Sequence, residues 1–343
     1  MYRYVSGLNL GTQLLTANYF NAKDPQSFLS KKGLCSSSFS EAREKLSWEV
    51  FPYLLSKISF KPITWKTHRV RSVDGTKITL PRTKEILAKF PIQKSHFGIA
   101  HYPKAVLVAA SEISSGQITQ TRLGNKYLSE NETLKEMLPQ FKAGDISLLD
   151  RGFRGRNLWL KFNEEKQFFV ARYKSTGQGI MKEFNLNKLD QTHEIIEKES
   201  GRKMSVRIVK GNLSKSGKRI YLITNLLDTK KYKKKELFDL YLKRQVVEES
   251  FKQIKKQLSF KLEYRAKKIN SFLQEVYAAI LAQALTSYLK FKVTTIKKKV
   301  ISFVGAAYSL EKYFFELLFQ YYHVASFQIH DYIQVLQKLL VHL

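Results

Sequence analysis

The chain has 343 residues, of which 43% are hydrophobic and 13% aromatic, so it can bury a sizeable core and is not a disordered basic tail. Its 59 Lys and Arg residues against 29 Asp and Glu residues give a formal net charge of +30, which favours a nucleic acid partner over a membrane surface. The single cysteine, Cys35, excludes an intrachain disulfide and a zinc site built from cysteines.

The sequence also indicates the cellular compartment in which the protein is expected. The first 30 residues lack the pattern of a signal peptide, and the most apolar stretch, 276–289, is too short and too polar to span a bilayer. We expect that stretch to be a buried helix. One cysteine fits a reducing compartment, so we expect a cytoplasmic protein without a membrane partner.

In chain order, the first part of the sequence changes from helical to mixed patterns. We expect residues 1–65 to form a helical N-terminal region. Residues 66–165 have apolar runs typical of strands and periodic segments typical of helices, and we expect them to form the first part of an α/β core. The predicted strands are 68–73, 77–80, 105–110, 118–122 and 146–149, and the predicted helices are 130–140 and 156–162.

The second part of the chain is first β-rich and then helical. Residues 166–228 read as an inserted β-rich subdomain, with a strand at 168–173 and a hairpin that pairs 205–210 with 220–225. Residues 229–290 would complete the core, and residues 291–343 would form a helical C-terminal region suited to dimerisation or to ordinary core. The predicted class is therefore α/β.

Two aspartates lie where predicted strands end. Asp74 follows the strand 68–73 and precedes Gly75, and Asp150 follows the apolar strand 146–149 and precedes a loop with two glycines. Functional sites in open α/β sheets gather at such strand ends. Each aspartate alone is more often part of a plain turn, so the prediction depends on both of them together with a third acidic residue.

That third residue, Glu248, lies in the segment 241–258, which has no Gly or Pro and reads as one helix. At helical spacing Tyr241, Arg244, Glu248 and Lys255 share one narrow arc beside an apolar arc. A carboxylate flanked by cations indicates either a metal-dependent site for phosphates or a solvated charged face. Glu249 competes as the acidic residue but lies about 100° round the helix.

The spacing of these four residues, Y-x2-R-x3-E-x6-K, resembles the signature of bacterial insertion-sequence transposases of the DDE class, in the insertion-sequence-4 family. The contexts of Asp74 (VDGT) and Asp150 (LDRGF) fit the same family. The resemblance covers roughly residues 40–290.

The resemblance implies an RNase H-like catalytic core, which begins with residues 66–165 and carries a β-rich insertion. Helical regions would flank this core on its N- and C-terminal sides, and the N-terminal one, residues 1–65, could bind DNA ends. Asp74, Asp150 and Glu248 would hold two Mg²⁺ ions, with Mn²⁺ as a substitute. The partners implied are the terminal inverted repeats and target DNA, in a homodimeric synaptic complex at the bacterial nucleoid. The residues expected to contact DNA are Tyr241, Arg244, Lys255, Arg172 and Lys252.

Two features depart from the family pattern. Gln245 stands where a Trp often follows the signature arginine, which places excision through a DNA hairpin in doubt, and no helix-turn-helix is evident before the core. We therefore weigh three functions. They are a cut-and-paste DNA transposase, an inactive DNA-binding derivative of one, and a structure-specific nuclease on the same fold.

Overall fold

A computed structural model describes residues 41, 43–58, 62–92, 94–95, 98–99, 101–124, 129–173, 183–185, 187–197, 199, 201–212, 219–254, 266–297 and 301–310. The chain divides into two compact units. We call Lys61–Leu80 with Leu87–Ser250 the sheet unit, and Met1–Phe60, Pro81–Ile86 and Phe251–Leu343 the helix unit.

The described strands of the sheet unit form one nine-stranded sheet and a separate small hairpin. The sheet has the order β6-β5-β2-β7-β8-β11-β10-β9, and β1 pairs with β2. The strands of the sheet are β1 (Thr64–Trp65), β2 (His68–Thr79), β5 (Lys104–Glu112), β6 (Ile118–Gly124), β7 (Ile146–Leu149), β8 (Phe168–Tyr173), β9 (Asp190–Ile196), β10 (Lys203–Asn212) and β11 (Arg219–Thr224), and the hairpin is β3 (Lys94–Ser95) with β4 (Gly98–Ile99).

Strand directions in the first half of the sheet identify the fold. Strands β6, β5 and β2 are antiparallel neighbours, whereas β2, β7 and β8 run parallel. This order and mix of directions is that of an RNase H-like sheet, so the predicted α/β fold is confirmed. Strands β11, β10 and β9 extend the same sheet beyond β8. The assignment of residues 166–228 to a subdomain of their own stays a prediction.

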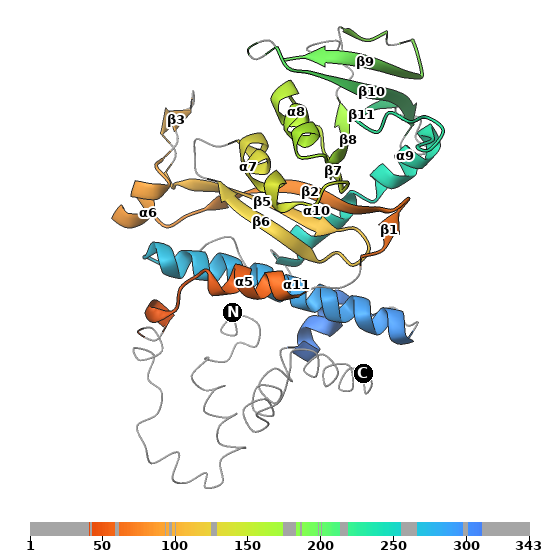
Figure 1. Ribbon diagram of the computed structural model, residues 1–343. Coiled ribbons are helices and arrows are strands. Elements are labelled where there is room, and N and C mark those ends of the chain that lie inside the picture. Colours follow the sequence, from red (N-terminus) through yellow and green to blue (C-terminus); the bar gives the residue numbers. More distant parts are fainter. Residues whose placement is uncertain are drawn as a thin grey trace, which may run out of the picture. The chain divides into compact units, whose positions relative to one another are not determined.

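Helices cover both faces of this sheet (Figure 1). Helices α7 (Glu130–Met137) and α8 (Arg156–Glu164) lie on one face, where Leu134 and Trp159 share a buried core with Val73. Helix α9 (Lys234–Leu242) packs on the other face, where Phe238 shares a second core with Val70. Val70 and Val73 are three positions apart on β2, and successive side chains of a strand point to opposite faces of the sheet. Strand β2 therefore contributes side chains to both cores.

Most predicted elements are confirmed to within a few residues. The strands at 146–149 and 168–173 match β7 and β8, and the helix 130–140 consists of α7 followed by a 3₁₀ turn, Leu138–Gln140. The predicted hairpin is β10 paired with β11 in an antiparallel register. Strand β9 has an irregular hydrophobic pattern and was not predicted, because it lies at the edge of the sheet and most of its side chains are exposed or partly exposed.

Two predicted boundaries are wrong. The strands 68–73 and 77–80 are one strand, β2, because antiparallel pairing with β5 continues through Asp74, which faces Ala109, and Gly75, which faces Val108. The segment 241–258 is not one helix. Helix α9 ends at Leu242, and α10 (Gln245–Lys252) begins after a turn at Lys243 and Arg244.

The helix unit contains α5 (Val50–Lys57) and the 29-residue α11 (Ile269–Lys297), and α6 (Lys84–Lys89) starts in it. Trp48 stacks on Tyr277 of α11 with ring centroids 5.0 Å apart. The predicted buried helix at 276–289 is part of α11 and is confirmed. None of the described helices, α11 included, combines the length and apolarity needed to cross a membrane. The N-terminal residues 1–40 and the C-terminal residues 311–343 lie outside the described residues.

Candidate active site

The two aspartates meet at the point where one of two parallel strands stops. In the parallel pairing of β2 with β7, Val73 lies opposite Leu149, and this is the last pair of the ladder. Asp74 and Asp150 are the next residues on the two strands. Strand β7 ends there while β2 continues to Thr79, so Asp74 has a paired strand on one side only. Both carboxylates therefore stand at an open end of the sheet.

A glycine amide orients each of these carboxylates. The backbone N–H of Gly75 donates to Oδ1 of Asp74 at 3.0 Å, and that of Gly152 donates to Oδ1 of Asp150 at 2.7 Å. A Cβ on Gly152 would lie only 2.9 Å from the same Asp150 oxygen. A side chain at this position would therefore push the carboxylate out of its hydrogen bond.

Glu248 reaches the site from the first turn of α10. Its Oε1 accepts a hydrogen bond from Nη2 of Arg244, one helical turn earlier, and the two side chains form an ion pair. The neighbouring Glu249 is exposed, whereas Glu248 is half-buried. The structure therefore turns Glu248, rather than Glu249, toward the signature arginine.

The acidic side chains influence one another's charge. Burial raises the pKa of Asp74 from an ordinary value of 3.8 to about 6, and the negative charges of Asp150 and Glu248 add to the rise. The Gly75 amide and the Arg244 guanidinium oppose it. These effects decline with distance, so Asp74, Asp150 and Glu248 share one electrostatic environment.

Tyr241 and Arg172 lie in the same environment. Tyr241 is buried at the end of α9, and burial raises the pKa of its hydroxyl to about 12, with Asp150 adding to the rise and Arg244 and Arg172 opposing it. Because its pKa is about 12, the Tyr241 hydroxyl keeps its proton and remains a hydrogen-bond donor at neutral pH. Arg172 is half-buried on β8, the strand next to β7.

Glu130, in the first turn of α7, is an acidic neighbour that the sequence did not reveal. A Cβ on Gly75 would lie 2.6 Å from its carboxylate, and a Cβ on Gly152 would lie 3.6 Å from its Oε2. Burial raises the pKa of Glu130, the charge of Asp150 adds to this, and Lys77 opposes it. The sequence predicted only that Glu130 lies at the start of a helix, 130–140. A helix prediction does not show which strand the first turn of the helix packs against.

Comparisons with known proteins identify the family of this chain. The family model described as "Transposase DDE domain" matches residues 65–285, well over half of the sequence. The chain belongs to the DDE transposase family. The predicted family is thereby confirmed.

The transposase domain is also similar to a curated relative, "Transposase InsG for insertion sequence element IS4" of Escherichia coli (strain K12). The two are 26% identical over 237 residues, which cover 66% of this chain and 53% of the relative. The chain thus spans about half the length of that relative. A piggyBac transposase in a synaptic complex with hairpin DNA aligns over 92% of this chain and 67% of its own, with 9% identity and a TM-score of 0.48. A likeness this weak supports no conclusion.

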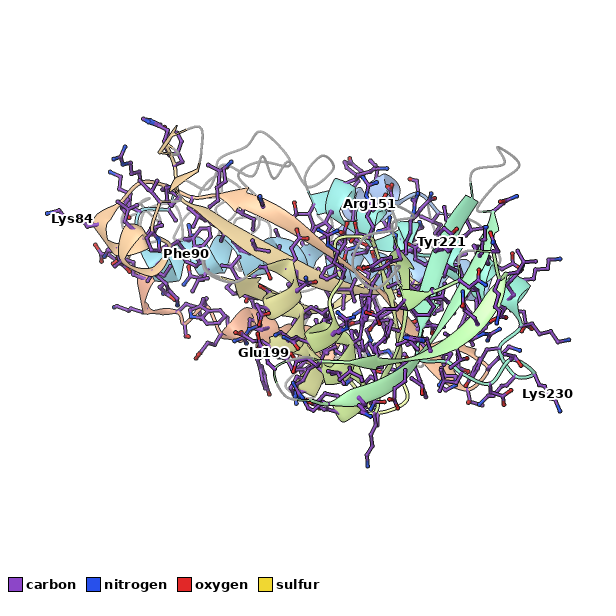
Figure 2. All side chains as sticks on the ribbon, turned by 90° about the horizontal axis from the view of Figure 1, so that it is seen from above. Lys84, Phe90, Arg151, Glu199, Tyr221 and Lys230 are labelled. Carbon is purple, nitrogen blue, oxygen red and sulfur yellow. The ribbon has the colours of Figure 1, made fainter. Side chains whose placement is uncertain are left out.

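Two of the predicted DNA contacts are not among the described residues of the sheet unit. Lys252 is exposed at the end of α10 and belongs to the helix unit, and Lys255 lies outside the described residues. Figure 2 shows Arg151 at the surface on the loop after Asp150, and Lys230 extending outward beyond the ribbon. Trp159 lies on α8 and Phe169 lies on β8. Both are buried in the core and stack on each other.

The donor set of this site fits a hard divalent cation, because it consists of carboxylate oxygens. The raised pKa of Asp74 agrees with this fit, because the carboxyl is buried away from water and lies near the negative charges of Asp150 and Glu248, which a bound cation would offset. Among the described residues, however, no three His, Cys, Asp or Glu side chains converge closely enough to hold a metal ion as they stand. In this arrangement the carboxylate of Glu248 is bound to Arg244.

Proposed function

We propose that this protein is a cut-and-paste DNA transposase, which cleaves DNA at the terminal inverted repeats of an insertion sequence and transfers the ends to target DNA. The observation that carries the proposal is the pairing of Val73 with Leu149, which sets Asp74 beside Asp150 within the electrostatic reach of Glu248. Its setting would be the bacterial nucleoid, and its expected active form is a homodimer in a synaptic complex.

Asp74, Asp150 and Glu248 would hold two Mg²⁺ ions, or Mn²⁺ in their place. Bound divalent cations would supply activation of the attacking oxygen and charge stabilisation at the scissile phosphate. Arg244 bonds only one oxygen of Glu248, Oε1, so the carboxylate would bind a cation either through its second oxygen or by exchanging the guanidinium for the cation.

The cationic and hydroxyl groups of the site suit a DNA phosphate. Nη1 of Arg244 is buried and has no hydrogen-bond partner among the described residues, so the guanidinium has a donor to offer. Tyr241 keeps its proton and can donate to a phosphate oxygen, and Arg172 adds positive charge from β8. Arginine binds phosphate oxygens with two donors at once. Lys252 and Lys255 would contact the DNA backbone further from the reacting phosphate.

The test is a cleavage assay with Mg²⁺ on a duplex that carries the terminal inverted repeat flanking the gene. Glu248→Ala is expected to lose at least about a hundredfold in cleavage rate, because a catalytic carboxylate is removed. The matched control is Glu249→Ala, the exposed neighbour on the same helix. It should cleave like the wild type.

The other two functions predict different results. An inactive derivative would bind the repeat and cleave nothing, whether or not Glu248 is present. A structure-specific nuclease would cut branched DNA of unrelated sequence as well as the repeat. Equal cleavage by the two glutamate variants would reject Glu248 as the third acidic residue.

A further inference from the structure

Helix α10, which carries Glu248, is held on the sheet by three buried serines. Oγ of Ser72 on β2 donates to the backbone carbonyl of Arg244 at 2.6 Å. Oγ of Ser250 on the helix lies 2.9 Å from two carbonyl oxygens, that of Gly116 and that of Val246 in its own helix, and shares its proton between them. Oγ of Ser111 on β5 donates to Oγ of Ser250 at 3.3 Å. Each serine is at most 1% exposed. We call these three residues the serine clamp.

The serine clamp occupies a place where apolar side chains are usual. Ser72 and Ser111 lie directly opposite each other on the antiparallel pair β2 and β5. A buried hydroxyl is costly unless it is hydrogen-bonded, and each of these hydroxyls has a partner. A hydrogen bond depends on direction as well as distance. The clamp therefore defines the rotation of α10 and its position along the sheet more narrowly than apolar contacts would.

One bond of the clamp lies at the turn between α9 and α10. The Arg244 carbonyl is 3.4 Å from the N–H of Val247, which is a long hydrogen bond, and it accepts the Ser72 hydroxyl at the shorter distance of 2.6 Å. Ser72 and Asp74 are two residues apart on β2 and so point to the same face, with their Cα atoms about 7 Å apart. One hydroxyl thus ties the start of α10 to the strand that carries Asp74.

We propose that Ser72 and Ser250 are positioning residues, which hold α10 at the rotation that turns Glu248 toward Asp74 and Asp150. This inference rests on the proposed function, because it assigns Glu248 to the same acidic site. The two bonds act at different points along the helix. Ser72 holds the turn before α10, and Ser250 holds the next turn of the helix against the loop between β5 and β6.

The test measures Mn²⁺ affinity of the full chain by the electron paramagnetic resonance signal of free Mn²⁺, in the absence of DNA. Ser72→Ala is expected to weaken Mn²⁺ binding by about five- to tenfold, the effect of one hydrogen bond. The control is Ser147→Ala. Ser147 is 1% exposed on β7 and pairs in register with Arg71, on the opposite face from Ser72 by strand alternation. It should stay within about twofold of the wild type.

A second variant guards against loss of folding. Ser250→Ala replaces a helical serine by the best helix former, so the fold should persist, and it should weaken Mn²⁺ binding in the same way. In the Glu248→Ala background, neither serine change should weaken binding further, because the positioned carboxylate is gone.

Three outcomes separate this inference from the proposed function. Unchanged Mn²⁺ affinity in both serine variants, with a loss in Glu248→Ala, overturns the inference alone. A loss that persists unchanged in the Glu248→Ala background also overturns it, since the serines would then act through another group. Unchanged affinity in Glu248→Ala overturns the proposed acidic site and the inference with it.

Discussion

Val73 and Leu149 lie opposite each other at the end of a parallel ladder, and this single pairing brings Asp74 and Asp150 together. The two aspartates are 76 positions apart in the sequence, and the residues next to one of them do not indicate that it lies near the other. The end of β7 leaves one side of β2 unpaired at Asp74. That opening is where a cation and a phosphate could approach both carboxylates.

The raised pKa of Asp74 means that the ionised carboxylate of this residue lowers the stability of the metal-free protein at neutral pH. Because the folded pKa is about 6 and the ordinary value is 3.8, the stabilising protonated form is fully present below about pH 4 and is lost as the pH rises through 6. The difference corresponds to roughly 3 kcal/mol. Asp74→Asn should therefore unfold at higher urea than the wild type at pH 7.5 in EDTA, and at similar urea at pH 4. Asp239→Asn, at an exposed position on α9, serves as the control and should change little at either pH.

Glu130 adds negative charge beside Asp150, so its removal should stabilise the metal-free protein and weaken cation binding. We expect Glu130→Gln to raise the melting temperature in EDTA by a few degrees and to reduce the further rise that Mg²⁺ produces. Glu132→Gln, in the same first turn but exposed, controls for the loss of a charge at the helix N-terminus. Identical melting curves for the two variants, with and without Mg²⁺, would argue against a role for Glu130.

Arg244 lowers the pKa of Asp74, so its removal should raise that pKa above 6. In Arg244→Gln, the loss of stability that accompanies ionisation of Asp74 in the metal-free protein should therefore continue to a higher pH than in the wild type. Urea unfolding at intervals between pH 4 and 8 measures this. Arg151→Gln removes an exposed cation next to Asp150, and the pH range of its stability loss should be the same as that of the wild type. Overlapping profiles for Arg244→Gln and the wild type would contradict the electrostatic link.

Breaking a buried ion pair at the start of β7 should destabilise the fold strongly. Arg71 is 1% exposed, pairs with Asp145, and lies over the ring of Phe141 at 3.9 Å from its centroid. Asp145→Asn leaves the buried guanidinium without its counterion, which should cost about 3–5 kcal/mol.

The control for this pair is Lys135→Met, which breaks the more exposed pair with Glu132. It should cost less than about 1 kcal/mol. Urea unfolding at pH 7 measures both changes, and equal costs would show that burial of Arg71 does not matter.

Local patterns in the sequence determined the elements and the family. The apolar runs at 146–149 and 168–173 define β7 and β8 because a buried strand needs only its own side chains to be recognised. The spacing of Tyr241, Arg244 and Glu248 likewise reveals the family without any structure. These signals lie within a few residues of one another, so they can be read along the chain.

Only the tertiary structure decided how those elements meet. Ser72 and Arg244 are 172 residues apart, yet their hydrogen bond accompanies the break between α9 and α10 in a segment whose periodicity predicts one helix. Strand β2 likewise continues through Asp74 because it pairs with β5 there, although the dipeptide Asp-Gly predicts a turn. The approach of Glu130 to Gly75 followed from the packing of α7. Each outcome depends on a partner distant in the sequence, and a local pattern contains no information about which distant group will supply the hydrogen bond or the charge.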